Sequence, residues 1–105
     1  MPTFFASPRF WNDYDRLTSA QAAAFQRARV QFVAALAEWE ASGFAGSPQF
    51  PSRLRVKSMA GHPHIFEMAW SRDGRCTWEF GGFQITRKCH VIWRRIGSHA
   101  IYADP

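Results

Sequence analysis

Residues near the end of the chain combine the side chains that cleavage of RNA requires. The stretch 95–102 (RIGSHAIY) places an arginine, a histidine and a tyrosine close together. RNA cleavage needs a group that deprotonates the 2′-hydroxyl, a cation for the phosphorane and an acid for the leaving oxygen. Histidine titrates near neutral pH, and arginine stabilises negative charge without titrating. We therefore select His99 and Arg95 as candidate catalytic residues, with Tyr102 as a residue that stacks on a base or donates a hydrogen bond.

Cations alternate with apolar side chains over residues 53–59. Arg53, Arg55 and Lys57 are separated by Leu54 and Val56. Because successive side chains of a strand point to opposite faces, this pattern predicts a strand with one basic face. Such a face attracts the phosphates of a nucleic acid. It equally suits a solvated strand whose charges protect a sheet edge from aggregation.

Other polar residues have simpler interpretations. Glu67 lies between Phe66 and Met68, so a strand would place it on the opposite face, where it either orients Arg95 or forms an ordinary cross-strand ion pair. The two cysteines and the nearby histidines lack the Cys-x-x-Cys or His-x-x-x-His spacing of a zinc site, and we expect no metal and no cofactor. The cysteines are expected as free thiols packed like small apolar groups.

Composition limits the class of protein. The chain has 105 residues, enough for one small domain, and it carries 13 Lys and Arg against 8 Asp and Glu, a formal net charge of +5. A compact domain with this balance attracts polyanions, of which nucleic acid is the commonest in a cytoplasm. A basic but inert surface, or one neutralised by an acidic partner protein, fits the same charge. The chain has neither a transmembrane run nor a signal peptide, so a cytoplasmic location without a membrane partner is expected.

Two helices are predicted before residue 42. Ser7 followed by Pro8 is typical of a helix start, and a short helix is expected to run to about Leu17. Thr18 and Gln21 form a capping box for a second helix. That helix carries apolar side chains at three- and four-residue spacing, at Phe25, Ala28, Phe32, Leu36 and Trp39. The stretch 42–53 is rich in Gly, Pro and Ser and is expected to link the helices to the strands.

The remainder of the chain alternates with the period of strands. We expect strands at 53–59, 65–71, 76–80 and 90–96, and a short additional strand at 4–5. Asp73-Gly74 favours a hairpin turn over 72–75, and Gly81-Gly82 is expected to be a loop. The predicted fold class is α+β, in which a helical hairpin covers one face of a small antiparallel sheet. The opposite face is then open to solvent or ligand.

Two segments carry a resemblance to a known family. Residues 95–102 resemble the terminal signature of the RelE/ParE superfamily of bacterial toxins, in which YafQ-type ribonucleases end in Arg-x-Gly-Ser/Thr-His followed by an aromatic residue. Residues 56–68 (VKSMAGHPHIFEM) resemble the basic strand, Gly-containing turn and aromatic-Glu-aliphatic run of the same superfamily. The order of helices, linker and strands agrees along nearly the whole chain. The resemblance implies a single RelE-like toxin domain over residues 1–105.

The same resemblance implies an activity, partners and site residues. It implies a toxin that cleaves mRNA without a metal, often in the ribosomal A site, and that a cognate antitoxin holds silent. His99 matches the terminal catalytic histidine and Arg95 the basic residue that would bind the scissile phosphate. Arg55 and Lys57 match the strand that holds the RNA backbone, and either His62 or His64 matches an upstream histidine of YafQ-like members.

Two other functions remain open on the same scaffold. One is a ParE-like inhibitor that binds DNA gyrase without doing chemistry, and the other is a nontoxic member that only binds an antitoxin or nucleic acid. The Gly-Ser-His sequence at 97–99 favours the nuclease.

Overall fold

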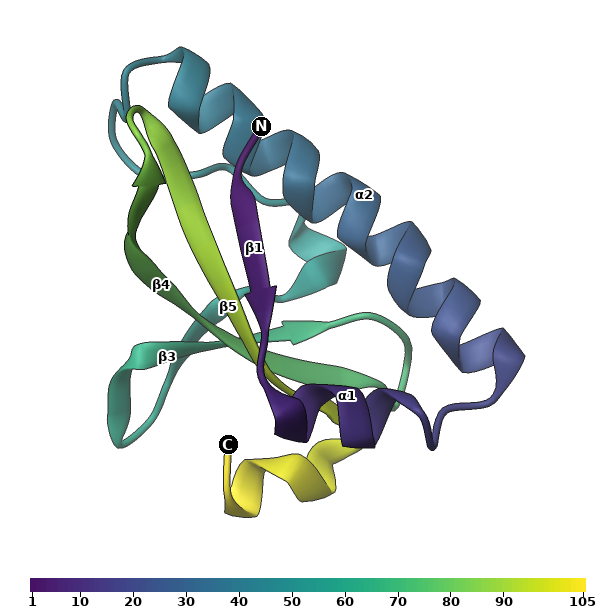
Figure 1. The fold of residues 1–105 in the computed structure, drawn as a ribbon. Coiled ribbons are helices and arrows are strands. Elements are labelled where there is room, and N and C mark those ends of the chain that lie inside the picture. Colours follow the sequence, from purple (N-terminus) through teal and green to yellow (C-terminus); the bar gives the residue numbers. More distant parts are fainter.

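Two helices and a five-stranded sheet make up the protein (Figure 1). The computed structural model describes all residues, 1–105. The elements in chain order are β1 (Thr3–Ala6), α1 (Pro8–Tyr14), α2 (Ser19–Ala41), the short 3₁₀ helix η1 (Ser52–Leu54), β2 (Lys57–Met59), β3 (His62–Ala69), β4 (Arg75–Ile85), β5 (Lys88–Gly97) and the 3₁₀ helix η2 (His99–Ala103). The predicted α+β class is confirmed.

The sheet is mixed rather than purely antiparallel. Its strand order is β1-β5-β4-β3-β2. The four later strands pair antiparallel, but β1 pairs parallel with β5, with Phe4 opposite Val91. The prediction of an antiparallel sheet was therefore wrong at one edge. Because both helices and three strands separate β1 from β5 along the chain, no tight hairpin forces these two strands to run in opposite directions.

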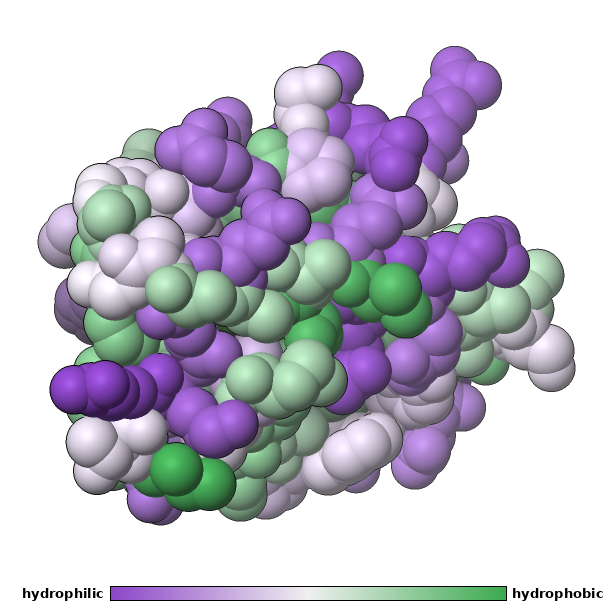
Figure 2. Space-filling view, turned by 90° about the horizontal axis from the view of Figure 1, so that it is seen from above, coloured by the Kyte–Doolittle hydropathy of each residue, from purple (hydrophilic) through white to green (hydrophobic).

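The face of the molecule seen from above the view of Figure 1 is mostly hydrophilic, with apolar groups between the hydrophilic ones (Figure 2). The exposed large apolar side chains come from several elements, including Phe5 of β1, Trp11 of α1, Val30 of α2 and Phe83 of β4. No helix has both the length and the apolarity that crossing a membrane requires.

Both predicted helix starts are confirmed. The Ser7 side chain accepts a hydrogen bond from the amide of Phe10, and Pro8 occupies the first turn of α1. Thr18 and Gln21 form the reciprocal capping box that begins α2. Helix α1 ends at Tyr14 instead of Leu17, because the chain tightens there into turns with three-residue hydrogen bonds.

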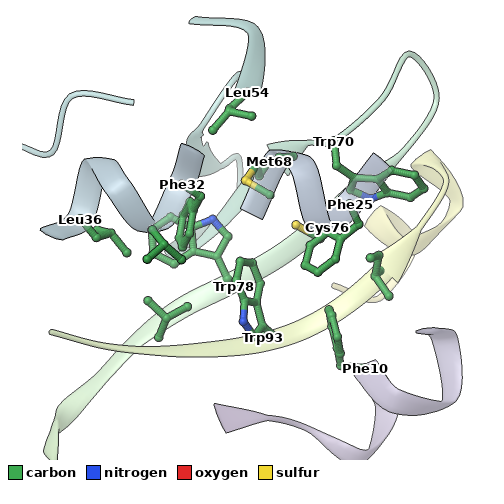
Figure 3. Packing of buried hydrophobic residues seen from close by; sticks show 14 of the residues in the cluster. Phe10, Phe25, Phe32, Leu36, Leu54, Met68, Trp70, Cys76, Trp78 and Trp93 are labelled. Atoms are coloured by element: carbon green, nitrogen blue, oxygen red, sulfur yellow. The ribbon is translucent and has the colours of Figure 1, made fainter. Parts of the chain in front are cut away.

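The core lies between the helices and one face of the sheet. The rings of Phe32, Trp78 and Trp93 pack against one another (Figure 3), and the centroids of Phe32 and Trp78 are 4.9 Å apart in an edge-to-face arrangement. Phe25 of α2 and Phe10 of α1 also contact Trp93. The apolar spacing predicted for α2 therefore marks the buried side of that helix.

Three of the predicted strands have other boundaries in the structure. Strand β3 runs over His62–Ala69 instead of 65–71. The alternation at 53–59 does not form one strand, because Leu54 is drawn into the core by η1 and Arg55 adopts left-handed backbone angles (φ 46°, ψ 43°), so β2 begins only at Lys57. Strand β4 continues through Gly81 to Ile85 instead of ending in a loop. Gly81 is needed there because a Cβ atom would lie 2.7 Å from the ring of His90 on the adjacent strand.

The sheet face opposite α2 is only partly covered. Figure 1 shows α2 and the terminal segment that contains η2 (yellow) on opposite sides of the strands. Glu67, Thr77 and Arg95 lie in register on β3, β4 and β5. Thr77 is completely buried, whereas Lys57, which lies beside Glu67 on β2, is exposed. The uncovered part of this face is therefore at β2 and β3.

Candidate nucleic-acid cleft

One cleft opens between η2 and the edge of the sheet formed by β2 and β3. We call it the RNA cleft; its volume is about 630 Å³. The lining residues come from β2 and the turn before it, from β3, from the start of β4 and from η2: Arg55, Val56, Lys57, Glu67, Ala69, Arg75, His99 and Tyr102. The cleft therefore unites residues that lie far apart in sequence, with three permanent cations against one carboxylate.

Arg75 is a cation of the RNA cleft that the sequence pattern predicts in the turn 72–75. It begins β4 and lies opposite Ala69 of β3 and Gly97 of β5. Its Nη1 donates hydrogen bonds to the carbonyl oxygens of Ser71, Arg72 and Gly74 at 3.1, 3.2 and 2.8 Å. These bonds hold the guanidinium at the cleft wall and leave its other nitrogens without protein partners.

His99 and Tyr102 reach the cleft from η2. The helix is capped by Ser98, whose hydroxyl oxygen accepts a hydrogen bond from the amide of Ala100. The His99 and Tyr102 rings meet edge to face, with centroids 5.7 Å apart and an interplanar angle of 82°. His99 is exposed, so its imidazole is accessible to a ligand.

The hydroxyl of Tyr102 faces the protein instead of the solvent. It is buried, and no side chain completes a hydrogen bond with it. Burial, together with the nearby negative charge of Glu67, raises the pKa of Tyr102 to about 12. The ring of Tyr102 thus lines the cleft, while its hydroxyl stays protonated and out of reach of a ligand.

Glu67 pairs with Lys57 across the β2–β3 ladder. The two residues lie directly opposite each other, and the Lys57 Nζ to Glu67 Oε1 distance is 3.6 Å. The expectation of an ordinary cross-strand ion pair is confirmed, and the alternative in which Glu67 orients Arg95 is wrong. Glu67 lies next to Tyr102 and is mostly buried, with 16% of its side chain exposed, whereas Lys57 extends into solvent.

Arg95 lies outside the RNA cleft. Its Nε and Nη2 donate to the two carboxylate oxygens of Asp13 at 2.6 and 3.1 Å, and its Nη1 donates to the carbonyl of Asp104 at 3.0 Å. Asp13 raises the pKa of Arg95. The register of β4 and β5 shifts between Thr77 and Trp78, which turns Arg95 to the face opposite Trp93. All three guanidinium nitrogens of Arg95 donate to Asp13 or Asp104, so the side chain is held against α1 and the chain end and away from the cleft.

Three other candidates also lie elsewhere. Arg53 Nε donates to Gln31 Oε1 of α2 at 2.8 Å, so Arg53 and Arg55 point to different surfaces. His62 and His64 are exposed at the start of β3 and do not line the RNA cleft. No group of three His, Cys, Asp or Glu side chains is arranged to hold a metal ion.

Solved structures resemble this chain over nearly its full length, although no protein-family model and no curated protein sequence matches it. A copper-bound mutant toxin from Helicobacter pylori aligns with a TM-score of 0.62 and 13% identity, covering 95% of this chain and 97% of that one. A YoeB/ParE toxin from Agrobacterium tumefaciens aligns with 0.57 and 10% identity, covering 92% and 98%. YafQ from Escherichia coli strain BL21(DE3) aligns with 0.50 and 12% identity, covering 97% and 98%.

These similarities establish the fold. The chain has the RelE/ParE-like toxin fold, as the sequence resemblance predicted. At such low identities, the functional assignment depends on the residues of the RNA cleft.

Proposed function

We propose that this protein is the toxin of a bacterial toxin–antitoxin pair and that it cleaves mRNA in the RNA cleft. One observation carries the proposal. The fold gathers Arg55, Lys57 and Arg75 around an exposed histidine, His99, on the sheet face that α2 leaves uncovered. Cations fix the phosphates of a polyanion, and a histidine exchanges protons near neutral pH. RNA fits this combination, because its phosphates bind the cations and its own 2′-hydroxyl can give its proton to the histidine.

The cations of the cleft would bind the phosphates on either side of the bond that is cut. Arg75 is held at the wall by three backbone carbonyl oxygens, so its remaining donors are already oriented. Arg55 and Lys57 reach in from the neighbouring edge. Arg75 therefore takes the stabilising role that the sequence resemblance gave to Arg95, since a guanidinium neutralises the additional charge of the phosphorane.

The reaction that fits these groups is an internal transesterification. The 2′-oxygen attacks the adjacent phosphorus, and the bond from phosphorus to the 5′-oxygen of the next nucleotide breaks. The 2′-hydroxyl loses a proton and the departing 5′-oxygen gains one, which leaves a 2′,3′-cyclic phosphate and a 5′-hydroxyl. His99 is the accessible group that exchanges a proton with one of these oxygens. The ring of Tyr102 holds the imidazole edge to face and offers a surface for a base. The step uses no metal ion.

The test compares two exposed histidines. His99→Ala should lower the rate of RNA cleavage roughly 100-fold or more and restore growth of cells that express the protein. His62→Ala removes a histidine outside the cleft and should leave both unchanged. Circular dichroism shows whether each variant is folded. Equal effects of the two substitutions, or toxicity that survives His99→Ala, would refute the nuclease.

Mapping of total RNA after induction separates the nuclease from the gyrase inhibitor. New 5′-hydroxyl ends in mRNA, absent from cells that express His99→Ala, support the nuclease. Intact mRNA with arrested replication supports an inhibitor of DNA gyrase and contradicts the proposal. The same assay on purified mRNA with and without ribosomes determines whether cleavage requires the ribosome.

The proposed toxin acts in the cytoplasm and needs a neutralising partner. A nuclease that cuts the mRNA of its own cell must be silenced, and a net charge of +5 favours an acidic antitoxin. The expected antitoxin is encoded next to the toxin gene, and its co-expression should abolish growth arrest. If the protein encoded by the adjacent gene binds the toxin stably but growth arrest continues, that protein is not the antitoxin.

A further inference from the structure

A second groove lies beside the RNA cleft, at the contact between α2 and the end of β3. We call it the α2 groove; its volume is about 370 Å³. Its polar lining consists of Arg27 and Gln31 of α2, Arg53 of η1 and Ser71 after β3. No acidic residue lines it, so two guanidinium groups meet here without a compensating carboxylate.

The α2 groove and the RNA cleft adjoin at Ala69, which lines both of them. Along the chain, Arg53 and Leu54 line the groove, and residues 55–57 line the cleft. Arg53 lies in the groove, whereas Arg55 and Lys57 lie in the cleft. The left-handed backbone of Arg55 (φ 46°) makes the turn that sends these neighbouring cations to the two sites. A non-glycine residue rarely adopts this conformation, and such residues concentrate at functional sites.

The guanidinium groups of the groove are available to a ligand. Arg53 uses only its Nε, which donates to Gln31, so Gln31 orients the guanidinium while the two terminal nitrogens remain unpaired. Arg27 is exposed and belongs to none of the ion pairs of the molecule. Two arginines with free donors match the geometry of phosphate oxygens.

We propose that the α2 groove binds a phosphate of the RNA strand outside the bond that is cut, and that it extends the substrate from a short fragment to a longer single strand. The proposal rests on the proposed function, because it assigns the groove to the same RNA. A strand that leaves the cleft past Ala69 enters the groove that Arg53 and Arg27 line. RNA bound in this way contacts the sheet edge and α2 together.

The test measures binding of RNA of two lengths to protein that carries His99→Ala, so that no strand is cut. A dinucleotide fills only the cleft, whereas an octanucleotide also reaches the groove. Arg27→Ala with Arg53→Ala should weaken octanucleotide binding by about tenfold and leave dinucleotide binding unchanged. Because each phosphate contact on a single strand contributes about 0.7 to the salt slope, the loss of one phosphate contact should lower the slope for the octanucleotide by about 0.7.

Two further variants serve as controls. Arg87→Ala removes an exposed arginine beyond the far end of β4, roughly 30 Å from Arg75 along the strand. It should change the binding of neither the dinucleotide nor the octanucleotide. The lysine pair Arg27→Lys with Arg53→Lys keeps the charge but not the paired donors of arginine, and it should retain more octanucleotide affinity than the alanine pair. Loss of affinity in the lysine pair equal to that in the alanine pair, with both pairs folded, would contradict a phosphate site.

The outcomes distinguish this proposal from the function on which it rests. If His99→Ala abolishes cleavage by the otherwise unchanged protein but the alanine pair behaves like Arg87→Ala, the α2 groove is not a subsite and the nuclease stands. If the unchanged protein neither binds nor cuts RNA of either length, both proposals are overturned. Selective loss of octanucleotide binding supports both.

Discussion

The carboxylate of Asp13 in α1 binds both the side chain of Arg95 and the backbone of β5. It accepts hydrogen bonds from Arg95 Nε and Nη2 at 2.6 and 3.1 Å and from the amide of Ile96 at 3.2 Å. Arg95 in turn donates to the carbonyl of Asp104. Asp13 and Arg95 are mostly buried, with 11% and 20% of their side chains exposed. This network ties α1 to the segment that carries His99 and Tyr102.

Arg95 is therefore a positioning residue, and its removal should cost stability. Arg95→Ala leaves the Asp13 carboxylate mostly buried without its partner, and we expect the free energy of unfolding to fall by about 2 kcal/mol. Arg95→Lys keeps the charge but loses the paired contact, so the fall should be smaller. Urea denaturation measures both changes.

The RNA-binding readout separates this role from phosphate binding. Because Arg95 pairs with Asp13 outside the cleft, the salt slope for RNA binding should be the same for a folded Arg95→Ala variant as for the unchanged protein. A folded Arg95→Ala variant with unchanged stability and a lowered salt slope would instead place Arg95 on the phosphate, as the sequence resemblance implied.

The two thiols should be unreactive in the folded protein. Cys76 and Cys89 are free and buried in the core. Burial raises the pKa of both thiols, and for Cys89, where the carboxylate of Glu40 adds to the effect, the value is about 12. Since the thiolate is the reactive form, neither cysteine should react with Ellman's reagent at neutral pH, and both should react in guanidinium chloride. Rapid reaction of either thiol without denaturant would contradict the buried placement.

Features specified by local sequence were predicted well. The caps at Ser7 and Thr18 depend on hydrogen bonds within one turn, so the order of residue types suffices to identify them. The apolar spacing of α2 identified its buried side because a helix has a fixed period. His99 and Tyr102 lie three residues apart, so their proximity followed from the sequence, although the helix η2 that carries them was not predicted.

Features that depend on distant partners were not predictable in the same way. The pair Gly81-Gly82 is typical of a loop. Gly81 nevertheless lies within β4, because the neighbouring ring of His90 on β5 leaves no room for a Cβ atom there. Arg95 and Arg75 are both arginines of neighbouring strands. Asp13, far away in the sequence, pairs with Arg95, whereas Arg75 donates only to backbone carbonyl oxygens from one of its nitrogens. Charge patterning identifies candidate cations, whereas their pairing is a property of the fold.

The backbone of Arg55 allows its charge to be tested separately from its conformation. At φ 46° and ψ 43° a residue with a Cβ atom is strained by about 1 kcal/mol relative to glycine. Arg55→Gly should therefore be more stable than Arg55→Ala by about 1 kcal/mol, although both lack the cation. RNA affinity should fall equally in the two variants, because each loses the same phosphate contact.

Thermal denaturation and RNA binding measured on both Arg55 variants check this expectation. Equal stabilities would mean that Arg55 is not left-handed. Full RNA affinity in either variant would mean that Arg55 does not contact RNA. Unequal stabilities would still show that its backbone is left-handed.

Tyr102 should titrate at unusually high pH. Burial raises its pKa from 10.0 to about 12, and the adjacent charge of Glu67 adds to the shift. The sequence contains only two tyrosines, Tyr14 and Tyr102, so Tyr14→Phe leaves one tyrosinate signal to follow by ultraviolet absorbance. The midpoint should lie near 12 in the folded protein and should be lowered by Glu67→Gln, which removes the neighbouring charge.

The same shift makes stability fall with rising pH. Between pH 10 and 12 an unfolded chain loses the Tyr102 proton while the folded chain retains it, so the unfolded state binds fewer protons and is favoured increasingly through that range. The stability of Tyr102→Phe should lack this part of the alkaline decline, because phenylalanine has no proton to lose. Urea denaturation in alkaline buffers compares the two proteins. A tyrosinate midpoint near 10 would show that the hydroxyl of Tyr102 faces solvent, and so would identical alkaline declines in the stability of the two proteins. The helix η2 would then lie farther from β3 than the contact between Tyr102 and Glu67 requires.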